Sequence, residues 1–110
     1  MKIHLIKKQS IEAYVLKNAG SKASFEIFLG LLYRADWNKP GDIVSTFRNA
    51  DIIGKGSDRV IFNIAGNQYR LICKYYFGDT KVHIFVKWIG THAEYTKLCN
   101  EGKQYEITSF

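Results

Sequence analysis

The sequence has few cysteines and no long apolar segment, and these shortages exclude several classes of protein. Its two cysteines, Cys73 and Cys99, form no CxxC pair and no His/Cys cluster, so the sequence predicts neither a disulfide framework nor a zinc site. The apolar stretch in MKIHLIKKQS is too short for a signal peptide. No run approaches the roughly 20 apolar residues of a membrane helix. We therefore expect a soluble, unexported protein of the reducing cytoplasm, with no membrane association.

Acidic residues are also scarce relative to basic ones. Sixteen Lys and Arg against ten Asp and Glu give a net charge of +6, and 15% of the residues are aromatic. This combination suits nucleic acid, because phosphates attract cations and bases stack on rings. Excess lysines that serve only solubility are the alternative. The stretch between Val60 and His92 holds one acid, Asp79, and four basic residues: Arg70, Lys74, Lys81 and Lys87.

The first half of the chain has helical periodicity. A chain of 110 residues without repeats or linkers predicts a single domain, residues 1–110. The spacing of apolar residues and breakers predicts a strand at 3–6, a helix from Ser10 as N-cap to about Gly20, a helix at 22–35, and a helical turn at 42–47 capped by Asp42. The second helix carries an apolar stripe of Phe25, Phe28, Leu29 and Leu32.

The second half changes to a period of two, which is typical of strands. Alternation predicts three antiparallel strands at 60–65, 69–75 and 82–88, joined by turns at GNQ and FGDT. One apolar face, which includes Trp88, is expected to meet the helices, so the fold class is α+β. The other face then carries Asn63, Arg70, Lys74 and Lys87 together. This face is either a functional surface or simply a solvated one.

The segment WIGTHAEY follows this sheet and contains a histidine and a tyrosine. Gly90 is expected to end the last strand, and Thr91 to cap a short helix through a T-x-x-E capping box with Glu94. His92 and Tyr95 are three residues apart, so they lie on one side of that helix. The pair is a candidate active site beside a basic strand end, although such a pair also occurs in simple packing.

Two motifs, NIAGNQYRL at 63–71 and IGTHAEY at 89–95, resemble the HigB-type mRNA interferases of the RelE superfamily. The order of strand, two helices, three-stranded meander and terminal helix is also similar to that superfamily, and ADWNKPGDI and RNADIIG resemble its upstream segments. The resemblance implies a RelE-like fold and a toxin of a type II toxin–antitoxin module that cleaves mRNA on translating ribosomes. It also implies a helix-turn-helix, HigA-like antitoxin, a toxin–antitoxin hetero-oligomer, and indirect contact with operator DNA through the antitoxin.

The resemblance also implies roles for individual residues. Arg70 matches a phosphate-binding arginine of RelE-like toxins, His92 a basic catalytic side chain, and Tyr95 a functional tyrosine. Where better-known RelE proteins carry lysines on the first meander strand, this chain has Ile61 and Asn63. We therefore expect His92 to carry proton transfer. Asn63 and Asn67 are then expected to position the RNA backbone or a base.

The chemistry of these residues fits RNA cleavage without a metal or another cofactor. No carboxylate cluster or HxH pattern offers metal ligands. An unperturbed histidine titrates near neutral pH and can act as acid or base, and an arginine can hold a phosphate bidentately. Tyr95 is expected either to orient the nucleophile or to stack a base, and Lys74 and Lys87 either to steer phosphates or to sit on a solvated face.

Two points stay open from the sequence. The alternative to the ribonuclease is a non-catalytic domain that binds RNA or protein through a basic sheet face. The tail from Asn100 to Phe110 is expected to be either a strand or disordered.

Overall fold

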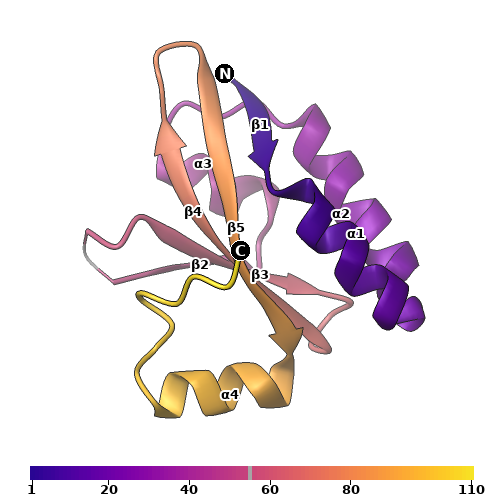
Figure 1. Cartoon of the computed structure of the whole chain (residues 1–110). Coiled ribbons are helices and arrows are strands. Elements are labelled where there is room, and N and C mark those ends of the chain that lie inside the picture. Colours follow the sequence, from indigo (N-terminus) through magenta and orange to yellow (C-terminus); the bar gives the residue numbers. More distant parts are fainter. Residues whose placement is uncertain (55) are drawn as a thin grey trace.

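The centre of the molecule is a five-stranded mixed sheet with the strand order β1-β5-β4-β3-β2. The computed structural model describes residues 1–54 and 56–110. The strands are β1 (Lys2–Ile6), β2 (Asp51–Ile53), β3 (Arg59–Ile64), β4 (Tyr69–Phe77) and β5 (Lys81–Thr91). The antiparallel meander β3-β4-β5 confirms the prediction from the alternation, and β1 joins β5 in parallel. This α+β architecture is consistent with the expected RelE-like fold (Figure 1).

The helices confirm the predicted order but not every predicted start. They are α1 (Lys8–Lys17), α2 (Lys22–Arg34), α3 (Pro40–Thr46) and α4 (His92–Asn100), with a short 3₁₀ turn, η1 (Ala19–Ser21), before α2. Ser10 is not the N-cap of α1, because Lys7 turns the chain with a left-handed φ of 73° and the helix starts earlier. Asp42 is likewise inside α3, where it accepts hydrogen bonds from the backbone N–H groups of Asn38 and Lys39. Pro40 fixes φ for the first turn, so α3 begins there.

The main hydrophobic core lies between the helices and one face of the sheet. The predicted stripe of α2 is buried through Phe25, Phe28 and Leu32, and Ile11 of α1 joins it. The sheet contributes alternate residues of the meander: Val60, Phe62, Ile64, Leu71, Cys73, Val82, Ile84 and Val86. Each large apolar side chain buried in this way contributes about 1.5–3 kcal/mol. Among the described residues, no helix has both the length and the apolar character to cross a membrane.

A β-bulge in β5 reverses the facing of Trp88. Ile72 pairs with Trp88, whereas the next residue, Cys73, pairs with Val86, so Lys87 is left between the two pairs. An extra residue shifts the alternation of a strand by one. The prediction that Trp88 lies with the main core is therefore wrong, because its indole packs on the opposite face near Ile72.

That opposite face is covered over much of its area, which corrects the expectation of an open polar face. A second hydrophobic cluster on this face is built on three buried residues, Ile61, Ile72 and Leu98, with Ile53, Trp88, Tyr95 and Ile107 packed against them. The chain after α4 turns back across the sheet (Figure 1). The tail is therefore neither a strand nor disordered, because turns at 101–102 and 104–106 lead to Ile107, which packs on the second cluster.

Arg59 attaches this tail to the sheet. The residue is 5% exposed, and its side chain donates hydrogen bonds to the backbone oxygens of Ile107 (2.7 Å) and Gln104 (3.3 Å). The backbone N–H of Ser109 donates to the Lys87 oxygen at the bulge. Burial lowers the pKa of Arg59, but an arginine remains charged at any physiological pH.

Replacing Arg59 with alanine is expected to destabilise the fold by about 1–3 kcal/mol, because two partly buried carbonyl groups lose a charged donor. The tail is then expected to become a site of proteolysis. Chemical denaturation and limited proteolysis would measure both effects. Arg48→Ala is the matched control, because Arg48 is an exposed arginine. Equal stability of the two variants would contradict the role given to Arg59.

Candidate active site

Arg70 and His92 meet where the start of β4 lies beside the start of α4. Arg70 is only 6% exposed. One terminal nitrogen, Nη2, lies 3.0 Å from His92 Nδ1 and donates to Asn67 Oδ1 at 2.5 Å, and Nη1 donates to the Tyr69 backbone oxygen at 3.1 Å. His92 itself is exposed. The pair therefore combines a buried fixed charge with a solvent-accessible imidazole.

The contact with Arg70 determines the tautomer of His92. A guanidinium has only donors, so in this contact Nδ1 of His92 is the acceptor. The neutral ring then carries its proton on Nε2. A proton on Nδ1 would remove the acceptor and place two positive charges side by side. In the structure as it stands, His92 thus presents an N–H donor at Nε2.

The local sequence fixes the start of α4, and with it His92. Thr91 Oγ1 accepts from the Glu94 backbone N–H at 3.2 Å, and Glu94 Oε1 accepts from the Thr91 N–H at 2.7 Å. This confirms the predicted capping box. The His92 N–H donates to the Gln68 backbone oxygen at 2.9 Å. The turn between β3 and β4 therefore holds α4 next to Arg70.

Gly90 makes room for the Trp88 ring beside Arg70. It does not end β5, as the sequence suggested, because the strand continues to Thr91. Gly90 is the register partner of Arg70 on β5. A Cβ on Gly90 would lie 2.6 Å from Trp88 Cζ2 and 3.1 Å from the Glu94 carboxylate. Glycine is thus required by the close approach of the indole.

A Gly90→Ala variant is expected to lose about 1–3 kcal/mol of stability, because the added methyl group forces Trp88 out of its packing. Thermal melts would measure the loss. Gly20→Ala is the matched control, since a Cβ there has nothing within 4 Å. A Gly90→Ala protein as stable as Gly20→Ala would contradict the packing argument.

Tyr95 lies next to Arg70 but inside the second cluster. Its ring centroid is 6.0 Å from Arg70 Cζ and 6.3 Å from the Trp88 ring. Burial, and then the neighbouring Cys99 thiol, raise the pKa of Tyr95 far above its ordinary value. The phenol is therefore neutral at physiological pH. It can stack on Arg70 or donate a hydrogen bond.

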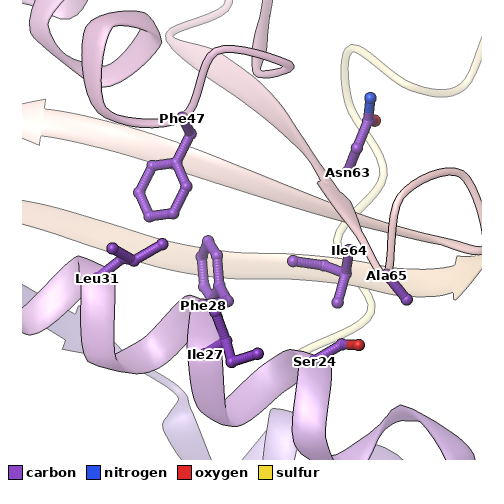
Figure 2. Close-up of a pocket in the computed structure, with 8 residues that line it drawn as sticks. All are labelled: Ser24, Ile27, Phe28, Leu31, Phe47, Asn63, Ile64 and Ala65. Carbon is purple, nitrogen blue, oxygen red and sulfur yellow. The ribbon is translucent and has the colours of Figure 1, made fainter.

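The two asparagines differ in their relation to Arg70. Asn67 is in the turn and contacts the guanidinium directly. Asn63 is the register partner of Arg70 on β3. It borders a hollow of about 250 Å³ between α2 and β3, which is lined mainly by apolar side chains. Figure 2 shows the Asn63 amide directed away from the ring of Phe28 and from Ile64. None of the three candidate catalytic residues lines this hollow.

Lys74 and Lys87 lie apart from this group. Lys74 is four residues beyond Arg70 on β4, about 13 Å along the strand, and the buried Ile72 lies between them. Lys87 is at the bulge, with its Nζ 5.7 Å from the centre of the Phe85 ring. Of the predicted site residues, the fold brings together Arg70, His92, Tyr95 and Asn67. It does not bring the two lysines to them.

Sequence reasoning missed the backbone groups that hold this site. The carbonyls of Gln68 and Tyr69 orient His92 and Arg70, and no side-chain pattern encodes them. The W-x-G spacing of Trp88 and Gly90 was a usable signal for a ring packed over a glycine. Within residues 1–54 and 56–110, no three His, Cys, Asp or Glu side chains gather as a metal-binding group.

Comparison with known proteins supplies the family. Residues 21–98 match a family model described as HigB_toxin, RelE-like toxic component of a toxin-antitoxin system. The chain is also similar to the mRNA interferase HigB of Escherichia coli O6:H1 (strain CFT073), with 26% identity over 96 residues that cover 87% of this chain and 91% of that protein. The resemblance seen in NIAGNQYRL and IGTHAEY is thereby confirmed. With its α+β fold and the match over most of its length, this chain belongs to the HigB toxin family, the RelE-like toxic components of toxin–antitoxin systems.

Proposed function

We propose that the toxin is an mRNA endoribonuclease that inhibits translation in the cytoplasm by cleaving mRNA on the ribosome without a metal. The contact of 3.0 Å between the Arg70 guanidinium and His92 Nδ1 carries the proposal. The name of the E. coli relative, an mRNA interferase, supports RNA as the substrate. Residues 1–110 act as one toxin domain.

In this proposal, His92 contacts the RNA at the surface, and Arg70 lies beneath it in the protein. His92 is exposed, whereas Arg70 is only 6% exposed. A guanidinium has five N–H donors, of which the contacts with Asn67, Tyr69 and His92 use three. The remaining donors are available for a phosphate. A charge held in so dry a place stabilises developing negative charge more strongly than one in water does.

The proposed reaction uses the 2′-hydroxyl of the RNA as nucleophile. The scissile phosphate draws the guanidinium away from His92 Nδ1, which then takes up a proton from solvent water. The 2′-oxygen bonds to phosphorus and loses its proton to water, while the bond to the 5′-oxygen breaks. His92 Nε2 gives a proton to that leaving oxygen. The products are a 2′,3′-cyclic phosphate and a 5′-hydroxyl, and the neutral phenol of Tyr95 keeps Arg70 in position.

The chemical ends of the products test this function. Purified toxin is incubated with mRNA on programmed ribosomes and with free mRNA, both in the Mg²⁺ buffer that intact ribosomes require, and the fragments are analysed by mass spectrometry. We expect cyclic phosphate and 5′-hydroxyl ends on the ribosome-bound mRNA. Fragments with 3′-hydroxyl and 5′-phosphate ends, the products of attack by metal-activated water, would contradict the mechanism. Binding without any cleavage would favour the alternative of a non-catalytic binding domain.

The toxin of a toxin–antitoxin system has an antitoxin partner. We propose that this partner is a HigA-like helix-turn-helix protein, which forms a hetero-oligomer with the toxin and connects it to operator DNA. A surplus of positive charge favours a partner with acidic surface. Affinity purification of the toxin from its native host is expected to recover such a protein at near-stoichiometric yield. Recovery of the toxin alone, from cells that grow normally, would contradict this proposal.

A further inference from the structure

A row of three rings crosses the sheet far from the Arg70–His92 pair. His4 of β1 is the register partner of His83 of β5, which is itself the partner of Tyr76 of β4. The ring centroids are 5.3 Å apart between His4 and His83 and 6.0 Å apart between His83 and Tyr76, and the second pair is stacked. The Nδ1 atoms of the two histidines lie 3.1 Å apart in a hydrogen bond. Three neighbouring strands thus hold one aromatic row in place.

Basic side chains border this row. Phe85 extends it, with its ring 6.5 Å from His83 and with Lys87 Nζ 5.7 Å from its centre. Lys74 is the partner of Phe85 on β4, and Lys2 pairs with Lys81 at the outer end of the sheet. We call this set the aromatic–basic strip; its members are Lys2, His4, Lys74, Tyr76, Lys81, His83, Phe85 and Lys87.

The strip is accessible because α4 and the tail cover mainly the other part of this face, and the tail meets the strip at Lys87, whose backbone oxygen accepts a hydrogen bond from the Ser109 N–H. The second cluster is formed by residues such as Ile61, Ile72 and Leu98, and it contains no member of the strip. Tyr76 is 62% exposed, and Lys74 and Lys81 are exposed as well. One acid, Asp79, lies in the chain between Lys74 and Lys87. The rings and cations of the strip therefore take no part in the second hydrophobic cluster.

We propose that the aromatic–basic strip is a second RNA-binding surface, which holds single-stranded RNA away from the cleavage site. Bases stack on aromatic rings whatever their sequence, and lysines at the border contact the phosphates. The inference rests on the proposed ribonuclease function and extends it. Tyr76 lies six residues beyond Arg70 on β4, about 20 Å along the strand. The RNA on the strip is therefore several nucleotides from the scissile phosphate, or belongs to the ribosome.

The strip also gives a role to Lys74 and Lys87, which the fold separates from the active site. When a lysine that contacts a phosphate is removed, RNA binding becomes weaker and depends less on salt concentration. Lys74→Ala is therefore expected to lower RNA affinity and the salt slope together. A lysine on a merely solvated face would change neither.

The test measures binding to RNA that cannot be cleaved, a short single-stranded oligonucleotide with 2′-O-methyl groups. Tyr76→Ala is expected to bind about 5- to 100-fold more weakly than wild type, and Tyr76→Phe, which keeps the ring, to bind like wild type. Tyr33→Ala is the matched control. Tyr33 is also an exposed tyrosine, with Lys8 Nζ 5.6 Å from its ring centre, but it is on α2. Circular dichroism verifies that all variants are folded.

Two arms distinguish the source of the RNA. Weaker binding of Tyr76→Ala to the oligonucleotide supports the strip as a site for mRNA, and weaker binding to empty ribosomes alone supports a site for ribosomal RNA. Unchanged binding in both arms, or an equal loss in Tyr33→Ala, would overturn the inference. So would a Tyr76→Ala protein that loses its antitoxin and keeps its RNA affinity. Because no step requires cleavage, a toxin that fails to cleave mRNA can still pass this test.

Discussion

An Arg70→Ala toxin is expected to cause no growth arrest, with mRNA cleavage reduced by about 10²–10³-fold or more. The substitution removes the fixed positive charge beside the scissile phosphate in the proposed mechanism. It also removes the donor that orients the His92 ring. Expression of the variant in cells without the antitoxin, followed by cleavage assays on purified protein, would measure both consequences.

Arg70→Lys and Leu71→Ala are the controls for this experiment. A lysine keeps the charge but not the planar fork of donors, so Arg70→Lys should recover only part of the activity. Leu71 is fully buried in the main core, so Leu71→Ala should cost about 2–5 kcal/mol of stability through a cavity. Arg70→Ala should cost less, about 1–3 kcal/mol, although its burial makes some loss unavoidable. An Arg70→Ala protein that is folded and fully toxic would contradict the role of Arg70.

Replacement of His92 with glutamine is expected to slow mRNA cleavage by about 10²-fold or more while binding changes little. Glutamine has a similar size and can still accept a hydrogen bond from Arg70, but it cannot transfer a proton. Initial cleavage rates and binding to programmed ribosomes, measured on the same protein, would separate the two properties.

Lys97→Gln is the matched control for the histidine, because Lys97 is an exposed residue of the same helix and is not part of the site. It is expected to cleave mRNA like wild type. If His92→Gln retains most of its activity, His92 is a positioning or packing residue and does not transfer a proton.

Much of the fold could be predicted from the sequence because it is encoded locally. The apolar spacing of Phe25, Phe28 and Leu32 predicts α2, and the alternation of the second half predicts the meander. The capping box of Thr91 and Glu94 predicts the start of α4. In each case the signal and the structure it specifies lie within a few residues of each other.

The bulge and the tail could not be predicted, because their causes lie far away in the sequence. The alternation of β5 runs on through Lys87 without a break, yet the pairing with β4 shifts there and turns Trp88 over. The tail offers little apolar pattern, but Arg59 binds its carbonyls from a strand more than forty residues earlier in the chain. A hydrogen bond of that kind has no local signature.

Part of the candidate site could be predicted from the sequence. The two motifs single out Arg70 and His92 as candidates. The pairing of β4 with β5, in which Tyr69 is the partner of Thr91, then brings His92 close to Arg70. The near-complete burial of Arg70 was not predictable, because it depends on α4 and on the turn at Asn67. The covering of Ile72, which lies between Arg70 and Lys74, was equally hidden, because it depends on Leu98 of α4 and Ile107 of the tail.

The central claim, that His92 and Arg70 together cleave RNA, is tested most directly by single-turnover cleavage of mRNA on programmed ribosomes from about pH 5.5 to about pH 8.5. Wild type, His92→Gln and Tyr95→Phe are compared. We expect His92→Gln to lose the chemical step and its dependence on pH while ribosome binding is kept, and Tyr95→Phe to change the rate much less. A loss confined to binding in His92→Gln, with an unchanged chemical step, would contradict proton transfer by His92 and leave Arg70 as the main catalytic group.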